Sequence, residues 1–420
     1  MTAPERSPRP HHRQPEGATD TMDFIAEGAA LLPELQEIRR TMHREPEIGL
    51  DLPKTQRIVL DAISDLGLKI TTGERTTSVV GVLRGGKPGP VVLLRGDMDG
   101  LPVQEQTGLE YAGENGNMHA CGHDLHTAGL IGAAKILAAH RDELPGTVLF
   151  MFQPGEEGYG GAKVMIDEGL LEAAGERPVA GYAIHVAPGP RGVFNTRSHA
   201  MLAGSNYLTV TVHGKGGHGS QPATALDPVP PMAEMITGLQ TMITRAIPTF
   251  EPVVMSVTMV NAGTAMNVIP DQAQFMATVR TLSNESRELF VERGRQLVEG
   301  IAAAYGCTAE FDFSLLYPVT WNDEGETRFT LQTLSEMFGP ERTTVWDDPL
   351  MGSEDFSFVA EELPISFYML AASPDEVDPA TAAYNHSPFV LFDDAVLGDQ
   401  AAALAQMAWK RLEQGSGKLE

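Results

Sequence analysis

The chain has 420 residues, 42% of them hydrophobic, and a formal net charge of −26. This length exceeds what one ordinary core accommodates, so two domains are expected. The acidic excess argues against a nucleic-acid partner and against an anionic membrane surface, because both attract basic proteins. Two cysteines, Cys121 and Cys307, are too few to cross-link a chain of this size. A cytoplasmic location is therefore expected.

The two ends of the chain are expected to lie outside the folded body. Residues 1–20 are rich in Pro, Arg and His and lack the apolar stretch of a signal peptide, so a disordered leader is predicted. Residues 414–420 read Gln-Gly-Ser-Gly-Lys-Leu-Glu, which predicts a flexible tail.

Between these ends, helical and strand patterns alternate over much of the chain. The helices predicted from apolar periodicity are 24–44, 54–66, 121–140, 326–338 and 394–412. The buried strands predicted from short apolar runs are 79–84, 91–95, 147–152, 179–186 and 365–370. Alternation of this kind favours an α/β fold with a mixed, largely parallel sheet and helices on both faces.

The middle of the chain follows a different order. Its predicted elements are a half-exposed strand at 206–213, a helix at 228–246, strands at 252–260 and 272–281, and a helix at 285–304. This β-α-β-β-α order is typical of an α+β, ferredoxin-like domain, in which helices cover an antiparallel sheet. We expect such a domain at residues 198–312, inserted into a catalytic domain formed by 21–197 and 313–413.

Polar residues capable of chemistry stand at the ends of three predicted strands. Asp97 and Asp99 follow the strand at 91–95, Glu156 and Glu157 follow the strand at 147–152, and His185 ends the strand at 179–186. Ligands of open α/β sheets bind beyond the carboxyl ends of the strands. The sequence therefore predicts a site at this edge of the sheet.

The segment His119-Ala-Cys-Gly-His-Asp124 adds metal-binding chemistry. A thiolate and an imidazole two residues apart, as in Cys121 and His123, can reach one metal ion. The alternative is a buried cysteine beside a loop histidine. At the start of the predicted helix, Asp124 is interpreted as a cap or dipole partner, and His126 as an exposed residue.

Adjacent carboxylates at Glu156 and Glu157 would repel each other without a cation. A metal resolves the conflict if one glutamate binds it and the other stays free as a proton shuttle. The alternative is a solvated acidic loop, which the preceding strand and the Pro154-Gly155 turn disfavour. Asp97 and Asp99 are either plain turn residues or carboxylates that orient metal-bound histidines.

A family resemblance extends over about residues 30–410. It rests on the ordered segments RGDMDGLP, MHACGHDLH, QPGEEG, IHV, GKGGHGSQP, GTAMNVIPD, MGSEDFSF and NHSP. Together they closely resemble the dinuclear metallohydrolases of the aminoacylase/carboxypeptidase family. The closest likeness is to its amidohydrolase branch, with hippurate hydrolases, N-acyl-amino-acid amidohydrolases and plant auxin-conjugate hydrolases.

The resemblance implies a cofactor of two divalent metal ions and a ligand set. Cys121 would bridge the two ions, His123 and His185 would complete one site, and Glu157 and His386 the other. Zinc suits a set of Cys, His and carboxylate ligands, while manganese, cobalt and nickel stay open.

The resemblance also assigns catalytic roles. Glu156 would be the general base and then the general acid, while a hydroxide held between the ions attacks the substrate. Other branches carry a His-x-Asp pair where this chain has Asp97-Met-Asp99. His123 would take over from that missing histidine, and Asp99 would be the retained orienting carboxylate.

Three further residues come from the inserted domain. His218, in Gly216-Gly-His-Gly219, resembles a lid histidine that reaches the scissile carbonyl across a homodimer, or a higher oligomer built on it. Asn267 and Arg280 resemble groups that hold the free carboxylate of the substrate. The glycines around His218 also fit a hairpin turn; a phosphate loop is disfavoured by the missing Gly-Lys-Ser/Thr ending.

The predicted function is metal-dependent hydrolysis of the amide bond of N-acyl amino acids or small peptides with a free carboxylate. One alternative is a cysteine hydrolase with Cys121 as the nucleophile. Another is a non-catalytic binding protein on the same scaffold. Chelation would abolish a metal enzyme and spare a thiol enzyme.

Overall fold

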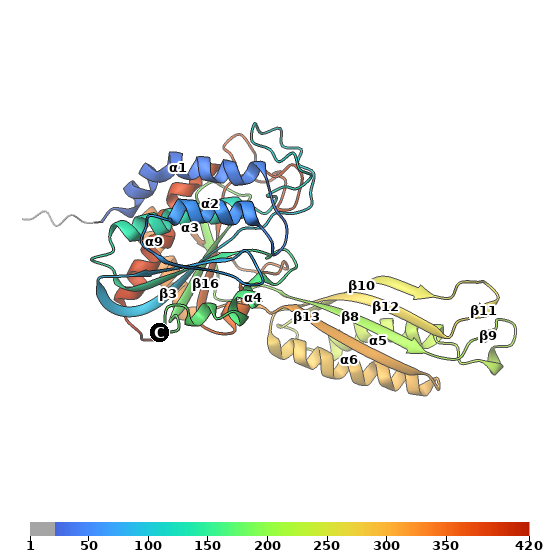
Figure 1. Cartoon of the computed structure of the whole chain (residues 1–420). Helices are drawn as coiled ribbons and strands as arrows, with labels where there is room; N and C mark the ends of the chain where they lie inside the picture. Colours follow the sequence, from blue (N-terminus) through green and yellow to red (C-terminus); the bar gives the residue numbers. More distant parts are fainter. Residues whose placement is uncertain (1–21, 420) are drawn as a thin grey trace, which may run out of the picture.

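Helices on both faces of an eight-stranded sheet form the larger part of the protein, and a second, elongated part projects from it (Figure 1). The structure is a computed structural model that describes residues 22–419. The leader predicted at residues 1–20 lies outside the described residues. No helix among residues 22–419 combines the length and the apolar character that crossing a membrane requires.

The large sheet has the strand order β1-β2-β4-β3-β5-β16-β6-β15. Its strands are β1 (Lys69–Thr72), β2 (Val79–Arg84), β3 (Lys87–Asp97), β4 (Pro145–Gln153), β5 (Ala180–Ala187), β6 (Phe194–Thr196), β15 (Thr343–Val345) and β16 (Ile365–Ala371). The four central strands, β4, β3, β5 and β16, are mutually parallel, whereas β1, β2 and β6 introduce antiparallel pairs. The predicted mixed, largely parallel sheet is confirmed.

Side chains of alternate residues in the central strands face opposite layers of helices. In β3, Val92 and Leu94 belong to the core under one layer, and Val91 and Leu93 to the core under the other. The first layer consists of α1 (Phe24–Arg44), α2 (Pro53–Ile63), α3 (His123–Ala139), α7 (Glu324–Phe338) and α9 (Leu397–Glu413). The second contains α4 (Gly161–Asp167) and α8 (Ser357–Ala360). Burial on both faces explains why these strands read as unbroken apolar runs.

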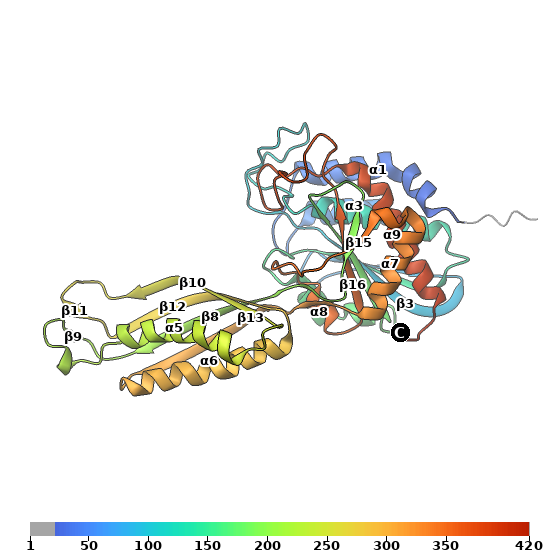
Figure 2. The same cartoon turned by 180° about the vertical axis from the view of Figure 1, so that it is seen from behind.

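The projecting part is a four-stranded antiparallel sheet, in the order β10-β12-β8-β13, covered by two helices (Figure 2). Its elements are β8 (Gly204–His213), α5 (Val229–Ala246), β10 (Val253–Ala262), β12 (Gln272–Thr281), α6 (Asn284–Ala304) and β13 (Thr308–Tyr317). The strand β13 was not predicted and runs past residue 312, while the domain boundaries themselves stay predictions. The chain enters and leaves the projecting part through the short paired strands β7 (His199–Leu202) and β14 (Thr320–Asn322).

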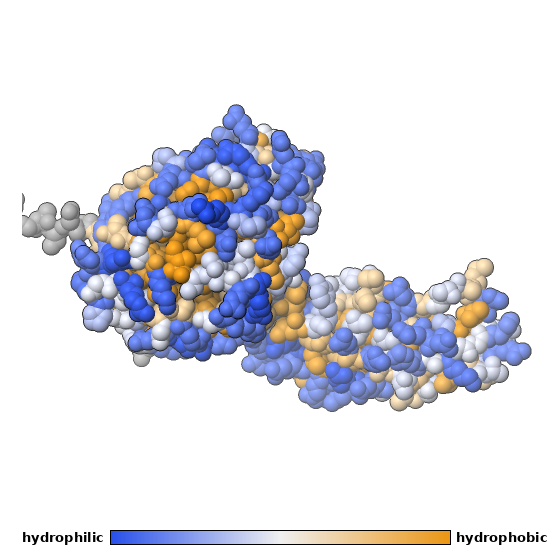
Figure 3. Space-filling model, in the orientation of Figure 1, coloured by the Kyte–Doolittle hydropathy of each residue, from blue (hydrophilic) through white to orange (hydrophobic). Residues whose placement is uncertain are grey.

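The far end of the projecting part carries a small two-stranded sheet of β9 (Gly217–His218) and β11 (Val268–Ile269). In Figure 3, hydrophilic residues cover most of this part and hydrophobic residues appear as small patches. Its own core lies between the sheet and the helices, around Val210, Phe275 and Phe290. The projecting part therefore has a hydrophobic core of its own.

A buried ion pair joins α9 to α7 beneath the large sheet. Arg411 Nε lies 3.0 Å from Glu326 Oε1, both side chains are 1% exposed, and the hydroxyl of Tyr182 also donates to Glu326. Arg411 further donates to the carbonyls of Gly415 and Gly417, within the segment predicted to be a flexible tail. One guanidinium thus connects two helices and the C-terminal residues.

We predict that Arg411→Met lowers the free energy of unfolding by about 3–5 kcal/mol, because it leaves the Glu326 carboxylate buried without its cation. Denaturant-induced unfolding measures this loss. The control is Arg57→Met, which removes an exposed ion pair with Asp61 at 2.9 Å and should cost at most about 1 kcal/mol. Equal losses in the two variants would contradict the prediction.

Candidate metal centre and active site

The parallel strands β3, β4 and β5 bring their carboxyl ends to one edge of the sheet. Asp97 is the last residue of β3 and lies opposite Gln153, the last residue of β4. Glu156 and Glu157 stand in the loop after β4, and His185 is near the end of β5. The strand ends that the sequence predicted to share an edge do so.

The sulfur of Cys121 lies at the centre of the cluster formed there. It is 3.4 Å from His185 Nε2 and 3.3 Å from His386 Nε2. His386 Nε2 is in turn 3.1 Å from Glu157 Oε1, which is 3.9 Å from His123 Nε2. The candidate ligands form two groups that share Cys121: one with His123 and His185, the other with Glu157 and His386. Within each group the ligand atoms lie within 4.8 Å of one another.

The hydrogen bonds of the histidines leave their Nε2 atoms available to a cation. His185 Nδ1 lies 2.8 Å from the carbonyl oxygen of Val186, so this nitrogen is the donor and Nε2 keeps its lone pair. His123 Nδ1 lies 3.3 Å from Asp99 Oδ1, while its buried Nε2 has no hydrogen-bond partner among the described residues. This is the arrangement of metal-binding histidines, whose second nitrogen is held by a carboxylate or carbonyl. The donor set therefore fits divalent cations.

Asp99 fixes the backbone of the loop after β4, which carries Glu156 and Glu157, as well as the ring of His123. Its Oδ1 accepts from the amide of Glu156 at 3.1 Å, and its Oδ2 accepts from the amide of Glu157 at 3.0 Å. Asp99 is 1% exposed. It thus orients one candidate ligand directly and the two neighbouring glutamates through their amides, which suits the predicted orienting role.

The two adjacent glutamates have opposite protonation tendencies. Burial, together with the nearby carboxylates Glu354 and Glu157, raises the pKa of Glu156 well above its usual range. Burial also acts against the charged form of Glu157, but the hydrogen bond with His386 and the charge of His123 outweigh it and lower the pKa of Glu157. Hydrogen bonds to Cys121 and Glu157 raise the pKa of His386 to about 10. One glutamate thus tends to hold a proton while its neighbour stays charged.

A buried arginine that the sequence analysis did not single out lies behind these carboxylates. The guanidinium of Arg95 is 2.8 Å from Asp97 Oδ2, 2.6 Å from Glu354 Oε1 and 3.3 Å from Asp355 Oδ1. All four side chains are at most 2% exposed. Arg95 sits inside an apolar strand, where a single charged residue could have served as the signal, because buried charges need partners.

At the start of α3, the exposed His126 and the capping role of Asp124 were wrong, whereas Asp124 does lie in the first turn, where a dipole partner would stand. His126 is not exposed: it is 1% exposed, its Nδ1 lies 2.6 Å from Asp97 Oδ1, and its Nε2 accepts from the amide of Val186 at 2.8 Å. Both ring nitrogens are therefore occupied. Asp124 does not cap the helix, whose N-cap is Gly122 without a side-chain hydrogen bond. It is buried instead against Arg39, at 2.6 Å, and His43, at 2.7 Å.

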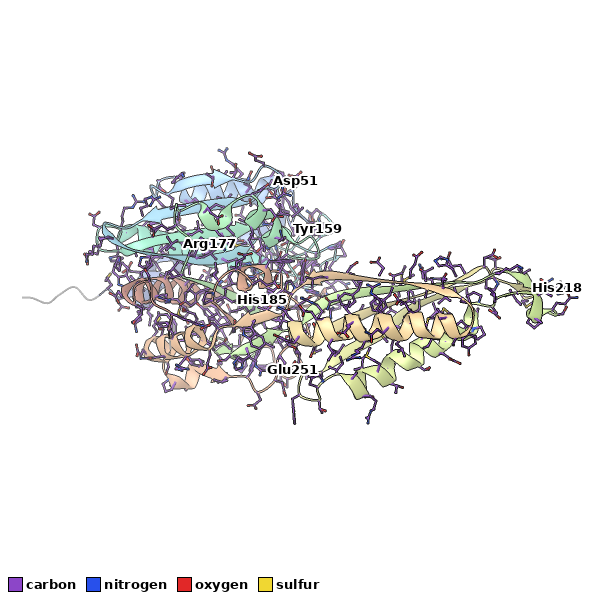
Figure 4. All side chains as sticks on the ribbon, turned by 90° about the horizontal axis from the view of Figure 1, so that it is seen from below. Asp51, Tyr159, Arg177, His185, His218 and Glu251 are labelled. Atoms are coloured by element: carbon purple, nitrogen blue, oxygen red, sulfur yellow. The ribbon has the colours of Figure 1, made fainter. Side chains whose placement is uncertain are left out.

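The inserted domain places its three candidate residues at opposite ends. Arg280, near the end of β12, lines a cavity of about 540 Å³ together with Cys121, Glu156 and His386. His218 belongs to the two-stranded sheet at the far end, away from His185 (Figure 4). Asn267 is beside His218, because its carbonyl accepts from the amide of Gly219 at 2.8 Å. Within one chain, the structure brings Arg280, but not His218 or Asn267, to the candidate metal ligands.

Known proteins are similar to this chain in sequence and in fold. The family model of "Peptidase family M20/M25/M40" matches residues 93–410. The chain is 36% identical over 394 residues to the hippurate hydrolase of Campylobacter jejuni, covering 93% of this chain and 100% of that protein.

The chain belongs to the M20/M25/M40 peptidase family. It is likewise 34% identical to the N-acetylcysteine deacetylase of Bacillus subtilis, over 86% of this chain and 93% of that protein. Its fold matches the YXEP protein of Bacillus subtilis, described as a dinuclear metal binding peptidase from the M20 family, with a TM-score of 0.78, 32% identity, and coverage of 91% of this chain and 99% of that one. The chain is therefore a hydrolase, and its candidate ligand clusters agree with metal binding in the family.

Backbone geometry in this M20 protein also serves the site. His386 has φ of +72°, in the left-handed region, and its amide donates to the carbonyl of Ala120 at 2.8 Å. Strain of this kind persists where surrounding structure enforces it, often at functional sites. Gly122, between Cys121 and His123, has φ of +84°, and an added Cβ would lie 2.2 Å from Val186 Cγ2. Only a glycine lets α3 begin this close to β5.

We predict that Gly122→Ala destabilises the protein by about 2–5 kcal/mol, as left-handed strain and overpacking add, and lowers its metal content. The matched control is Gly116→Ala, at φ of +87°, where an added Cβ would meet no described atom within 4 Å. The control should lose only the strain component, about 1–2 kcal/mol, and keep its metal. Thermal unfolding and elemental analysis measure both effects. Similar behaviour of the two variants would contradict the steric argument.

Proposed function

We propose that this protein hydrolyses the amide bond of N-acyl amino acids, or of small peptides, that carry a free carboxylate. The observation that carries the proposal is the pair of ligand groups sharing Cys121, with Glu156 buried beside both. The names of two relatives, a hippurate hydrolase and an N-acetylcysteine deacetylase, support this substrate class.

In this proposal two divalent ions, zinc first among them, are held by the ligand groups. Cys121 is the shared ligand, His123 and His185 belong to one ion, and Glu157 and His386 to the other. Bound divalent ions polarise a carbonyl and lower the pKa of water, which is the chemistry that amide hydrolysis needs. Manganese, cobalt and nickel are compatible with the same donors.

Glu156 moves the proton. Its carboxylate accepts a proton from the attacking water and then donates it to the nitrogen of the leaving amine. Burial and the neighbouring carboxylates favour the protonated form of Glu156, which supports the donation step. Asp99 keeps the loop of Glu156 in place through the amide of that residue.

Arg280 binds the free carboxylate of the substrate. It lines the cavity that contains Glu156 and His386, and its buried Nη1 has no hydrogen-bond partner among the described residues. Burial lowers the pKa of Arg280, and Tyr207 offsets only part of this effect. A substrate carboxylate would supply the missing partner in the bidentate geometry that guanidinium favours.

A second copy of the chain supplies His218 and Asn267. Both lie at the far end of the projecting part in one chain, so a homodimer through the inserted domain would bring them to an active site. The outer strand β10 leaves Val254, Met259 and Val260 about half exposed, which supports pairing along this edge. His218 would then contact the scissile carbonyl, and Asn267 would assist Arg280. A cytoplasmic location, with small-molecule rather than nucleic-acid or membrane partners, completes the proposal.

The alternatives use the same residues differently. As a nucleophile, Cys121 would attack the carbonyl itself, with a histidine as base. Its sulfur, however, is the one atom common to both ligand groups, which supports ligation instead. A binding protein without catalysis would retain the metals and the cavity but show no turnover.

We predict that Glu156→Gln keeps its metal content but loses turnover by on the order of 10²–10⁴-fold, because the amide cannot accept the proton. Elemental analysis and hydrolysis of benzoylglycine and other N-acyl amino acids measure the two effects. Chelation of the wild-type protein should abolish turnover, and restored divalent metal should recover it. Undiminished turnover in Glu156→Gln, or activity that survives chelation, would reject the mechanism.

We further predict complementation between two inactive variants. His218→Ala and Glu156→Gln should each be nearly inactive alone, but mixed dimers contain one site with an intact Glu156 and the partner's intact His218. Statistical mixing should restore about one quarter of the wild-type activity, since half the dimers are mixed and each has one working site of two. Activity is measured after subunit exchange. Failure to recover activity in verified mixed dimers would rule out the shared site.

A further inference from the structure

Tyr317, the last residue of β13, holds the backbone of the loop that carries Glu156 and Glu157. Its hydroxyl donates to the carbonyl of Glu156 at 2.6 Å and accepts from the amides of Gly158, at 2.8 Å, and Gly160, at 3.3 Å. A phenol has one donor and two acceptor lone pairs, so its capacity is fully used. The side chain is 3% exposed, and burial raises the pKa of Tyr317, which keeps the proton on the donating oxygen.

The loop after β4 needs such a restraint. Gly155, Gly158 and Gly160 have φ of +71°, +89° and +66°, and glycine-rich backbone is intrinsically free to change conformation. On one side, Asp99 holds the amides of Glu156 and Glu157. On the other side, Tyr317 holds the carbonyl of Glu156 and the amides of Gly158 and Gly160. The first restraint comes from the large sheet, and the second comes from the projecting part.

Tyr317 also belongs to a row of residues that crosses the projecting sheet. It lies opposite Ser205 of β8, which lies opposite Arg280 of β12. Residues directly opposite each other in antiparallel strands point to the same face. All three line the cavity that contains Glu156. One row of residues therefore carries both Tyr317, whose hydroxyl is bonded to the loop of Glu156, and Arg280, which is proposed to bind the substrate carboxylate.

We propose that Tyr317 is a positioning residue that ties the loop of Glu156 to the sheet carrying Arg280, so that carboxylate binding and placement of the general base are coupled. The coupling rests on the proposed function, whereas the tether itself is independent of it. Tyr317 does not touch the reacting atoms; it acts through the backbone of Glu156. A residue that only stabilised the fold would not separate turnover from substrate affinity.

The kinetic test is Tyr317→Phe in the metal-loaded full chain. This change keeps the ring packed edge-on against Phe358, at 6.1 Å between centroids, and deletes three hydrogen bonds. We expect kcat to fall about 10-fold through misplacement of Glu156, with KM, metal content and the melting temperature nearly unchanged. The matched control is Tyr305→Phe, at the residue that follows α6. It removes a hydroxyl bonded to Glu234 of α5 and should leave kcat intact. Unchanged kcat in Tyr317→Phe, or parallel losses of kcat and stability, would overturn the proposal.

Hydrogen exchange tests the tether without relying on activity. The amides of Gly158 and Gly160 should exchange faster in Tyr317→Phe than in the wild type or in Tyr305→Phe. Unchanged exchange would overturn the tether. A wild-type protein inactive on every N-acyl amino acid would reject the proposed function, and exchange alone would then decide the tether. Tyr317→Met, which also lacks the hydroxyl, serves as the second variant should the phenylalanine variant not fold.

The coupling has its own test in the combined variant Arg280→Met with Tyr317→Phe. If the row couples the two groups, the loss in kcat/KM of the double variant is smaller than the product of the two single losses. Losses that simply multiply would mean that Tyr317 holds the loop independently of Arg280, and would overturn the coupling.

Discussion

Compensation of buried negative charge is the constraint on which this structure depends. Carboxylates gather behind and around the edge of the large sheet, and such groups are costly to bury without cations. Arg95 offsets part of the charge of the set behind the edge, formed by Asp97, Glu354 and Asp355. In front of it, Glu157 and the sulfur of Cys121 face histidines and the position proposed for metal. Glu156 lies between these two sets, and its burial beside Glu354 and Glu157 raises its pKa and favours the protonated form.

Much of the fold could be predicted because its signals are local. Buried parallel strands such as β4 are continuous apolar runs, and α1 has a regular apolar stripe, so the prediction at 24–44 agrees with α1 residue for residue. The strand β13 was missed although Ala309, Phe311, Phe313 and Leu315 alternate with polar residues, which is the pattern of a half-buried strand. The positions of Glu156 and His185 followed from where their strands end, which requires only the parallel order.

Other features depend on contacts that no local pattern encodes. The burial of His126 is set by packing against Asp97 and Val186, far away in the chain. Arg95 stands at the end of an apolar run, and two of its carboxylate partners, Glu354 and Asp355, lie about 260 residues later. The sequence could not predict that His218 lies far from Arg280. It also could not predict that Tyr317 is bonded to the loop of Glu156. Both features depend on the length and direction of the projecting sheet.

The place of β16 in the large sheet has a consequence for biosynthesis. This strand, residues 365–371, lies between β5 and β6, which are close neighbours in sequence at 180–187 and 194–196. A nascent chain still lacking it has a gap in the middle of the sheet, and His386 has not yet been made. The projecting sheet, complete at Tyr317, leaves the ribosome earlier, and domains generally fold as units during synthesis. The candidate ligand cluster is thus completed late in translation, after β16 closes the gap and His386 is added.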